Sequence, residues 1–253
     1  MRGLRRVQWG NWRSIAREIA IIVVGVLVAL GAGDLLESWN WTRKVAQAEL
    51  ALHREASTNA MYAVEQVTVA PCVEAQLAAA KEGLLASGNV LEAMPAYAEP
   101  HFDYVYRLPL RPWLVSTWQA SNGDGTLAHM ESHRRTAYAM LYRQLEDMNV
   151  RADQIDRLSS RALAMASPIA LDPHTRASLL GELMEQVGQS QSQSLVALQV
   201  LVKMRELELM PPVEEIEKFM AAASGTADFC KAHGLPMADW QALLPERAIK
   251  PAE

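Results

Sequence analysis

The feature of this sequence that most constrains its fold is an unbroken run of apolar and small residues from Ile19 to Gly33. A helix that spans a lipid bilayer needs about 20 consecutive, mostly apolar residues. Leu36 extends the run, and tryptophans, which are enriched at both membrane–water interfaces, flank it on each side. These interface tryptophans are Trp9, Trp12, Trp39 and Trp41. The sequence therefore predicts a transmembrane helix over residues 19–36.

The charges around this run predict its orientation. Residues 1–18 contain a single acidic residue, Glu18, and five arginines: Arg2, Arg5, Arg6, Arg13 and Arg17. Basic residues beside a transmembrane helix are retained on the cytoplasmic side. We therefore expect a cytoplasmic basic leader over residues 1–18 and an exported, periplasmic domain over residues 37–253.

Two other interpretations of the apolar run remain open. A buried core helix can have this length, but it would not usually carry a basic leader and paired tryptophans. A cleaved signal peptide would place small residues such as Ala29 and Gly31 before its cleavage site. Against cleavage, the leader is long and the run continues without a turn into an amphipathic segment. We favour a retained anchor.

Small residues follow one face of the predicted transmembrane helix. Gly25, Ala29 and Gly33 are spaced four apart, and small residues at this spacing allow two helices in a membrane to approach closely. Glycine and alanine are also common in membrane helices in general, so chance is the competing explanation. We expect this stripe to pack against a second copy of the chain or another membrane protein.

The composition indicates an all-α protein. Half of the residues are hydrophobic and 21% are charged, which is typical of a folding sequence rather than a disordered one. Phenylalanine is scarce while alanine, leucine and methionine are plentiful, a mixture that favours helices. The formal net charge is −5 despite the basic leader. An acidic domain argues against nucleic acid as a partner, because its phosphates require a basic surface.

Periodicity and capping signals divide the exported part into helices. A helix from Leu35 to Val69 follows the apolar run directly, which allows one rod of about 80 Å, and Pro71 is expected to end it. Residues 89–112, with four prolines, are expected to form a long loop. Further helices are predicted over 72–86, 113–120, 132–166, 172–209, 212–222, 226–232 and 236–244. No segment is typical of a strand, and we expect a helical bundle built on two long antiparallel helices.

The anchor carries a resemblance to a known family. The run EIAIIVVGVLVAL from Glu18 to Leu30, followed by Trp39-Asn40 and a charged helix reaching Asn59, resembles a family of uncharacterised bacterial single-pass membrane proteins, catalogued as a domain of unknown function. A weaker similarity covers residues 117–142. The resemblance implies a bacterial inner-membrane location and an extracytoplasmic helical region. It implies no activity.

Few residues are candidates for chemistry. His129 and His133 are four apart, which suits a shared metal, but no third ligand is implied and the zinc-protease order is absent. The Gln/Ser run 189–194 either lines a polar cavity or is a solvated helix turn. The aromatic residues of 101–118, among them Trp113 and Trp118, suit a binding surface, although we favour a role in the core. We expect no metal and no cofactor.

Cys72 and Cys230 are the only cysteines. An even number of cysteines in an exported domain suggests a disulfide, and two buried thiols are the alternative. The bridge would tie the early helices to the C-terminal segment.

These features favour a non-enzymatic, membrane-anchored accessory or scaffold protein. Its expected partners are the lipid bilayer and either another membrane protein or a second copy of itself. One alternative is a ligand-sensing module that signals through a membrane partner, since about 18 residues in the cytoplasm are too few for a signalling domain. The other alternative is an envelope enzyme whose site has no recognisable motif.

Overall fold

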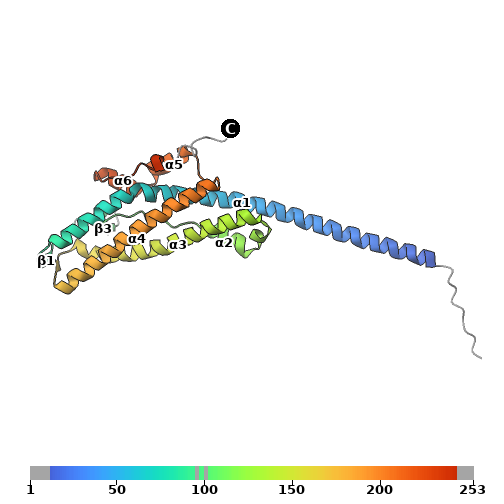
Figure 1. Ribbon diagram of the computed structural model, residues 1–253, viewed down its shortest axis with the longest axis horizontal. Helices are drawn as coiled ribbons and strands as arrows, with labels where there is room; N and C mark the ends of the chain where they lie inside the picture. Colours follow the sequence, from blue (N-terminus) through green and yellow to red (C-terminus); the bar gives the residue numbers. More distant parts are fainter. Residues whose placement is uncertain (1–11, 95–96, 100–101, 244–253) are drawn as a thin grey trace, which may run out of the picture.

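The computed structural model of the protein describes residues 12–94, 97–99 and 102–243. Helices dominate this part of the chain, as expected for an all-α protein (Figure 1). The helices are α1 (Trp12–Ala86), α2 (Ser116–Gly123), α3 (Ser132–Ala162), α4 (Pro173–Glu206), α5 (Val213–Ala222), α6 (Gly225–Ala232) and α7 (Trp240–Leu243), with 3₁₀ turns η2 (Thr126–His129) and η3 (Leu163–Ala166).

Helix α1 is one continuous element of 75 residues, about 110 Å long at the usual helical rise. Its N-terminal part extends away from the rest of the molecule, and its C-terminal part packs beside α3 and α4 (Figure 1). The expected rod is therefore present, and it is longer than the sequence indicated.

Pro71 does not end this helix, so the predicted break there is wrong. A proline removes one backbone hydrogen bond from a helix interior. Tertiary packing offsets this loss, because Val69, Cys72 and Val73 are all fully buried around the proline. In addition, the carbonyl of Thr68 accepts a hydrogen bond from the backbone N–H of Ala238, at 2.8 Å.

The structure contains short strands, so the expectation that no segment forms a strand is wrong. β1 (Val90–Leu91) pairs antiparallel with β4 (Ile169–Ala170), and β2 (Tyr97–Glu99) pairs antiparallel with β3 (Phe102–Tyr104). Segments of two or three residues are too short to carry the alternating pattern that identifies a strand in sequence. β1, β2 and β3 lie within residues 89–112, which were expected to form a loop, and β4 lies between η3 and α4.

Helices α3 and α4 begin and end close to the predicted positions. Asp172 caps α4, because its Oδ1 accepts the N–H groups of His174 and Thr175 at 2.8 and 2.9 Å. Ser132 is the first residue of α3, and Glu131 occupies the cap position without a side-chain hydrogen bond. The last predicted turn of α3 is the separate 3₁₀ turn η3.

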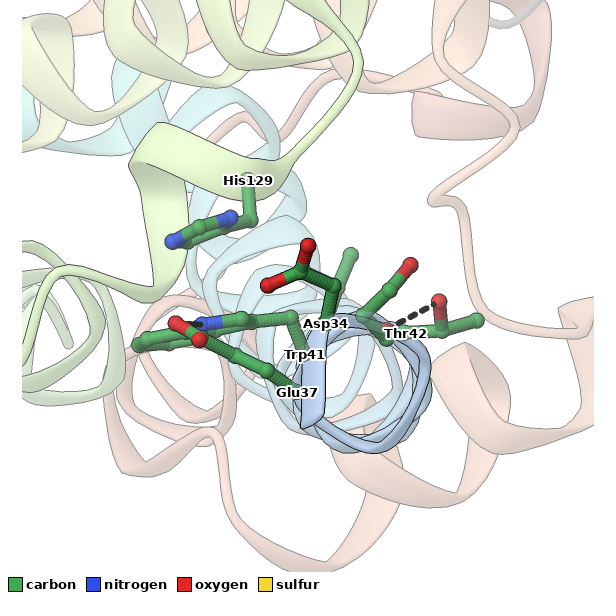
Figure 2. A pocket seen from close by; sticks show the side chains of 7 residues that line it. Asp34, Glu37, Trp41, Thr42 and His129 are labelled. Carbon is green, nitrogen blue, oxygen red and sulfur yellow. Dashed lines mark hydrogen bonds between the residues drawn. The ribbon is translucent and has the colours of Figure 1, made fainter. Parts of the chain in front are cut away.

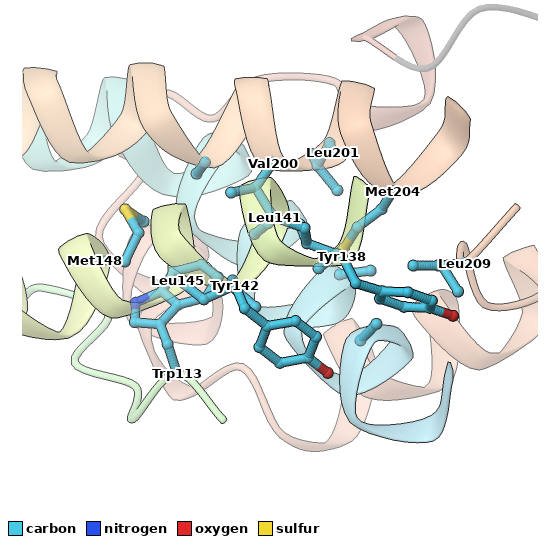
Figure 3. Close-up of a cluster of buried hydrophobic side chains, with 14 of the residues drawn as sticks. Trp113, Tyr138, Leu141, Tyr142, Leu145, Met148, Val200, Leu201, Met204 and Leu209 are labelled. Atoms are coloured by element: carbon cyan, nitrogen blue, oxygen red, sulfur yellow. The ribbon is translucent and has the colours of Figure 1, made fainter. Parts of the chain in front are cut away.

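Two hydrophobic clusters form the core. The first joins α1, α3 and α4 and is centred on Leu141, Leu145 and Met204 (Figure 3). The second lies farther along α1 and includes Leu77 and Leu84. Between them, buried polar side chains meet across α1 and α4: Gln66, Gln186, Ser190 and Gln193. The Gln/Ser run is thus partly inside the molecule rather than fully solvated.

The segment between β3 and α2 is held in place by three side-chain amides, each of which pairs with both backbone groups of one residue. Gln76 of α1 pairs with Arg107, Asn149 of α3 pairs with Trp113, and Asn59 of α1 pairs with Leu114. We call residues 107–115 the strap.

The aromatic residues of the strap region pack into the core. Trp113 is buried, and Trp118 stacks on the buried Tyr142 with ring centroids 5.1 Å apart. The favoured core role of these aromatic residues therefore agrees with the structure.

The sulfur atoms of Cys72 and Cys230 lie at disulfide distance, 2.09 Å. The two residues belong to α1 and α6. The pair therefore joins the long helix to the C-terminal helices, as the prediction of a bridge requires.

Candidate functional site at the junction of the apolar helix and the domain

The N-terminal part of α1 is an apolar helix that no other described part of the chain covers. Among the described residues, it contains the one helical stretch that is long and apolar enough to cross a membrane, and none of that stretch is buried. Ile22 and Val28, for example, have 64% and 65% of their surface exposed. Apolar surface of this extent is expected to contact a membrane or another protein, because large exposed apolar patches are rare on soluble proteins.

The small-residue stripe lies on this bare part of the helix. Gly25, Ala29 and Gly33 are all exposed. A methyl group placed on Gly25 or Gly33 would meet no atom within 4 Å. The described chain therefore offers no partner for the stripe, and its predicted role in helix packing stays a prediction.

The predicted interface tryptophans have different surroundings. Trp12 and Trp39 are exposed, with 63% and 57% of their surface accessible, whereas Trp9 lies outside the described residues. Trp41 is only half-exposed, because it contacts the rest of the domain.

Trp41 marks the place where the domain contacts the emerging helix. Its indole stacks on the imidazole of His129 in η2, with ring centroids 3.8 Å apart and planes 13° from parallel. One turn along α1, Lys44 forms an ion pair of 3.0 Å with Asp124. The loop between α2 and α3 is thus attached to α1 by a ring stack and an ion pair.

The local sequence explains the shape of this loop. Asn122-Gly-Asp-Gly125 forms the turn that ends α2, and Gly125 adopts φ 80°, a left-handed conformation that glycine adopts without strain. Asp124 then accepts hydrogen bonds from the backbone N–H and the hydroxyl of Thr126, at 2.9 and 2.5 Å. Farther along α1, Glu49 accepts a hydrogen bond from Arg134 at 3.1 Å.

The charge of Asp124 is stabilised by these contacts. Its hydrogen bonds from Thr126, together with the neighbouring Lys44, lower the pKa of the Asp124 carboxyl to about 2. Hydrogen bonds to the charged form of a carboxyl favour that form. The Asp124 carboxyl therefore stays ionised across the neutral and mildly acidic range.

An open depression of about 470 Å³ lies at this junction (Figure 2). The side chains around it come from α1 and η2: Asp34, Glu37, Ser38, Trp41, Thr42, Val45 and His129. Figure 2 shows His129 above Trp41, with the carboxylate of Asp34 directed to the same space. We call this depression the junction pocket.

The polar groups of the junction pocket are partly fixed. The Trp41 indole N–H donates to Glu37 at 3.4 Å, and the Thr42 hydroxyl donates to the carbonyl of Ser38 at 2.9 Å. Within the described chain, neither Asp34 nor Glu37 forms an ion pair. The pocket therefore contains carboxylate oxygens that can accept hydrogen bonds, and no cation of the described chain pairs with them.

His129 and His133, the candidates for a shared metal, have different surroundings. His129 stacks on Trp41, whereas His133 is an exposed partner of Glu131, at 2.9 Å. Residues 12–94, 97–99 and 102–243 contain no group of three or more metal-binding side chains. No metal role is assigned to either histidine.

No family model, curated protein or solved structure matches this chain. The resemblance of residues 15–60 to a bacterial membrane family is therefore an expectation that the comparisons leave untested.

Sequence reasoning missed most of the junction pocket. Trp41 was expected at a lipid interface, His129 was considered only as a possible metal ligand, and no role was expected for Asp34, Glu37 or Lys44. The contact joins residues far apart in the chain, and no periodic pattern reports such a contact. The usable signal was the Asn122-Gly-Asp-Gly125 turn, which returns the chain towards α1.

Proposed function

We propose that the protein is a single-pass, membrane-anchored accessory or scaffold protein without enzymatic activity. Its apolar helix would span a bacterial inner membrane, with residues 1–18 in the cytoplasm and residues 37–253 in the periplasm. The observation that carries this proposal is the continuity of α1: a bare apolar segment and a buried helix of the domain are parts of one element. The arginines before Ile19 support the orientation.

We propose further that the exported part is a helical bundle with α3 and α4 as its antiparallel pair. The short connection through η3 and β4 supports this arrangement, because short loops join antiparallel neighbours. In Figure 1, the colours of α3 and α4 progress in opposite directions along their common length.

A scaffold role fits the continuity of α1. A helix without a hinge holds the domain at a fixed height and rotation relative to the membrane segment. In α1 the internal proline lies within the packed domain rather than at its exit. A partner that binds the domain would thus be positioned relative to the membrane.

The partner is either another membrane protein or a second copy of the chain. The exposed stripe of Gly25, Ala29 and Gly33 offers a surface for close helix contact in lipid. Purification of the full chain in a mild detergent, followed by native mass measurement, tests this. We expect a stoichiometric complex with a membrane protein, or a homo-oligomer.

The variant Gly25→Leu with Ala29→Leu should insert normally but lose the associated protein or second copy. As a control, Val24→Ala with Val28→Ala changes the same helix outside the stripe and should leave association unchanged. If the stripe variant still forms the complex, the contact lies in the exported domain rather than along the stripe. A lone monomer from the wild-type chain would contradict the scaffold proposal.

A second candidate function is ligand sensing through a membrane partner, and one observation favours it. A depression of about 410 Å³ brings Trp118, Asn122, Arg135 and Arg143 together. Guanidinium groups beside an indole suit an anionic ligand. A panel of small carboxylates and phosphates should then raise the Tm of the wild-type chain and not of Arg143→Gln. An unchanged Tm across the panel would argue against sensing.

A further inference from the structure

We propose that the junction pocket binds the primary ammonium group of a phospholipid headgroup, that of phosphatidylethanolamine. This inference deepens the proposed function and rests on it, since the lipid is present only if α1 spans a bilayer.

The first argument is depth. The apolar segment ends at Leu36, and the helix rises about 7.5 Å from there to Trp41. The headgroup layer adds roughly 5–7 Å to each side of the hydrocarbon core. Asp34 lies two residues before that end and Trp41 five residues after it, so the junction pocket extends from the edge of the hydrocarbon core through the headgroup layer of the exported side.

The second argument is charge. Asp34 and Glu37 bring two carboxylates to one pocket, and neither has an ion-pair partner among the described side chains. The cations nearest in sequence make other contacts. Lys44 pairs with Asp124, and the guanidinium of Arg43 lies over the ring of Trp39, 4.9 Å from its centroid. Among the described residues, no cation pairs with these carboxylates, so the pocket is open to a cation from a ligand.

The third argument is hydrogen bonding, which selects among cationic headgroups. A primary ammonium has three N–H donors, and the pocket offers the carboxylate oxygens of Asp34 and Glu37 together with the hydroxyl of Ser38. The quaternary ammonium of choline has no N–H donor and cannot make these bonds. The pocket should therefore prefer phosphatidylethanolamine over phosphatidylcholine.

The stacked rings of His129 and Trp41 form one wall of the pocket. The two rings hold the domain against α1 on one side of the pocket, beside the Asp34 carboxylate (Figure 2). The site is consequently built from both the membrane-proximal helix and the folded domain.

The test uses the full chain in nanodiscs that contain equal amounts of phosphatidylethanolamine and phosphatidylcholine. Native mass spectrometry then counts the lipids that remain bound as the disc is removed. We expect retention of phosphatidylethanolamine over phosphatidylcholine by about fivefold, a preference consistent with two exposed ion pairs. The variant Asp34→Asn with Glu37→Gln should retain both lipids equally.

A matched control changes two carboxylates of the same helix far from the pocket. Glu74 and Glu82 are exposed on α1, and Glu74→Gln with Glu82→Gln should keep the wild-type preference. Flotation of each variant with vesicles measures membrane insertion separately. Loss of flotation by the wild-type chain would overturn the proposed function, whereas intact flotation without lipid preference would overturn only the headgroup site.

A competition experiment tests whether the bound ammonium group belongs to a lipid or to a soluble compound. Free glycerophosphoethanolamine carries the same headgroup without acyl chains, and millimolar amounts should displace little of the retained lipid. Full displacement by the free compound would overturn a lipid site and indicate a site for soluble amines. Equal lipid preference in the control and the pocket variant would also overturn the proposal.

Discussion

Trp41 and His129 stack face to face, with ring centroids 3.8 Å apart, and this contact joins the helix that leaves the domain to the loop between α2 and α3. It lies only a short distance beyond the last residue of the apolar segment. The domain therefore begins to contact α1 almost where the apolar surface ends. If α1 spans a membrane as proposed, a domain attached in this way is held close to it rather than on a flexible stalk.

The ring stack predicts a measurable effect of His129→Ala. Aromatic stacking adds about 1 kcal/mol beyond area burial, so the variant should lose about that much unfolding free energy. Hydrogen–deuterium exchange should rise in residues 124–131 and remain unchanged around Leu141, Leu145 and Met204 at the centre of the first hydrophobic cluster. His133→Ala serves as the control, since His133 is an exposed partner of Glu131. Equal exchange in both variants would show that the stack does not hold the loop.

Asp124 predicts a pH dependence at the junction. Hydrogen bonds from Thr126 lower the pKa of Asp124 to about 2. Because the folded-state pKa is below the ordinary value, the stabilising contribution is complete above that value and disappears as the pH falls through about 2. A carboxyl-carbon NMR titration measures this pKa.

In Thr126→Val the hydroxyl donor is lost, and the pKa of Asp124 should rise towards its ordinary value of 3.8. The backbone N–H donor remains in this variant. A wild-type pKa at the ordinary value would contradict the hydrogen-bonded geometry of the loop.

The strap predicts a strongly destabilising substitution at Asn59. Asn59 is fully buried and pairs with both backbone groups of Leu114, at 2.7 and 2.8 Å. Asn59→Ala leaves that N–H and that carbonyl without their partner, which should cost about 2–4 kcal/mol in chemical denaturation. Asn122→Ala, at an exposed asparagine, should change the unfolding free energy by less than about 0.5 kcal/mol. Similar losses for both variants would contradict this role.

The pair of Cys72 and Cys230 predicts a redox-dependent stability. The two residues are 158 apart in sequence, and closing so long a loop stabilises a fold by up to about 5 kcal/mol in the chain-entropy model. Reduction should therefore lower the Tm of the helical domain. Thiol labelling of the denatured, unreduced chain should find no free thiol. Two labelled thiols would exclude the bridge.

The elements with local signals were predictable from sequence. The apolar run forms the exposed part of α1, Asp172 before Pro173 begins α4, and Gly125 lies in the turn after α2. Each of these signals acts through neighbouring residues. Such signals report backbone geometry that the local sequence itself imposes.

The features that depend on tertiary contacts were not predictable. Pro71 is a valid helix terminator in isolation, and only the packing of Val69 and Val73 keeps α1 continuous. In the same way, the stack of Trp41 on His129 requires the loop after α2 to return to α1. No pattern within one segment contains that information.

The orientation of the chain in the membrane is the central claim, and paired reporter fusions after Glu253 test it most directly. Alkaline phosphatase, which requires an oxidising compartment, should be active at this position, and green fluorescent protein exported through the same route should be dark. The converse result, a fluorescent and phosphatase-negative pair, would place the helical domain in the cytoplasm and contradict the account.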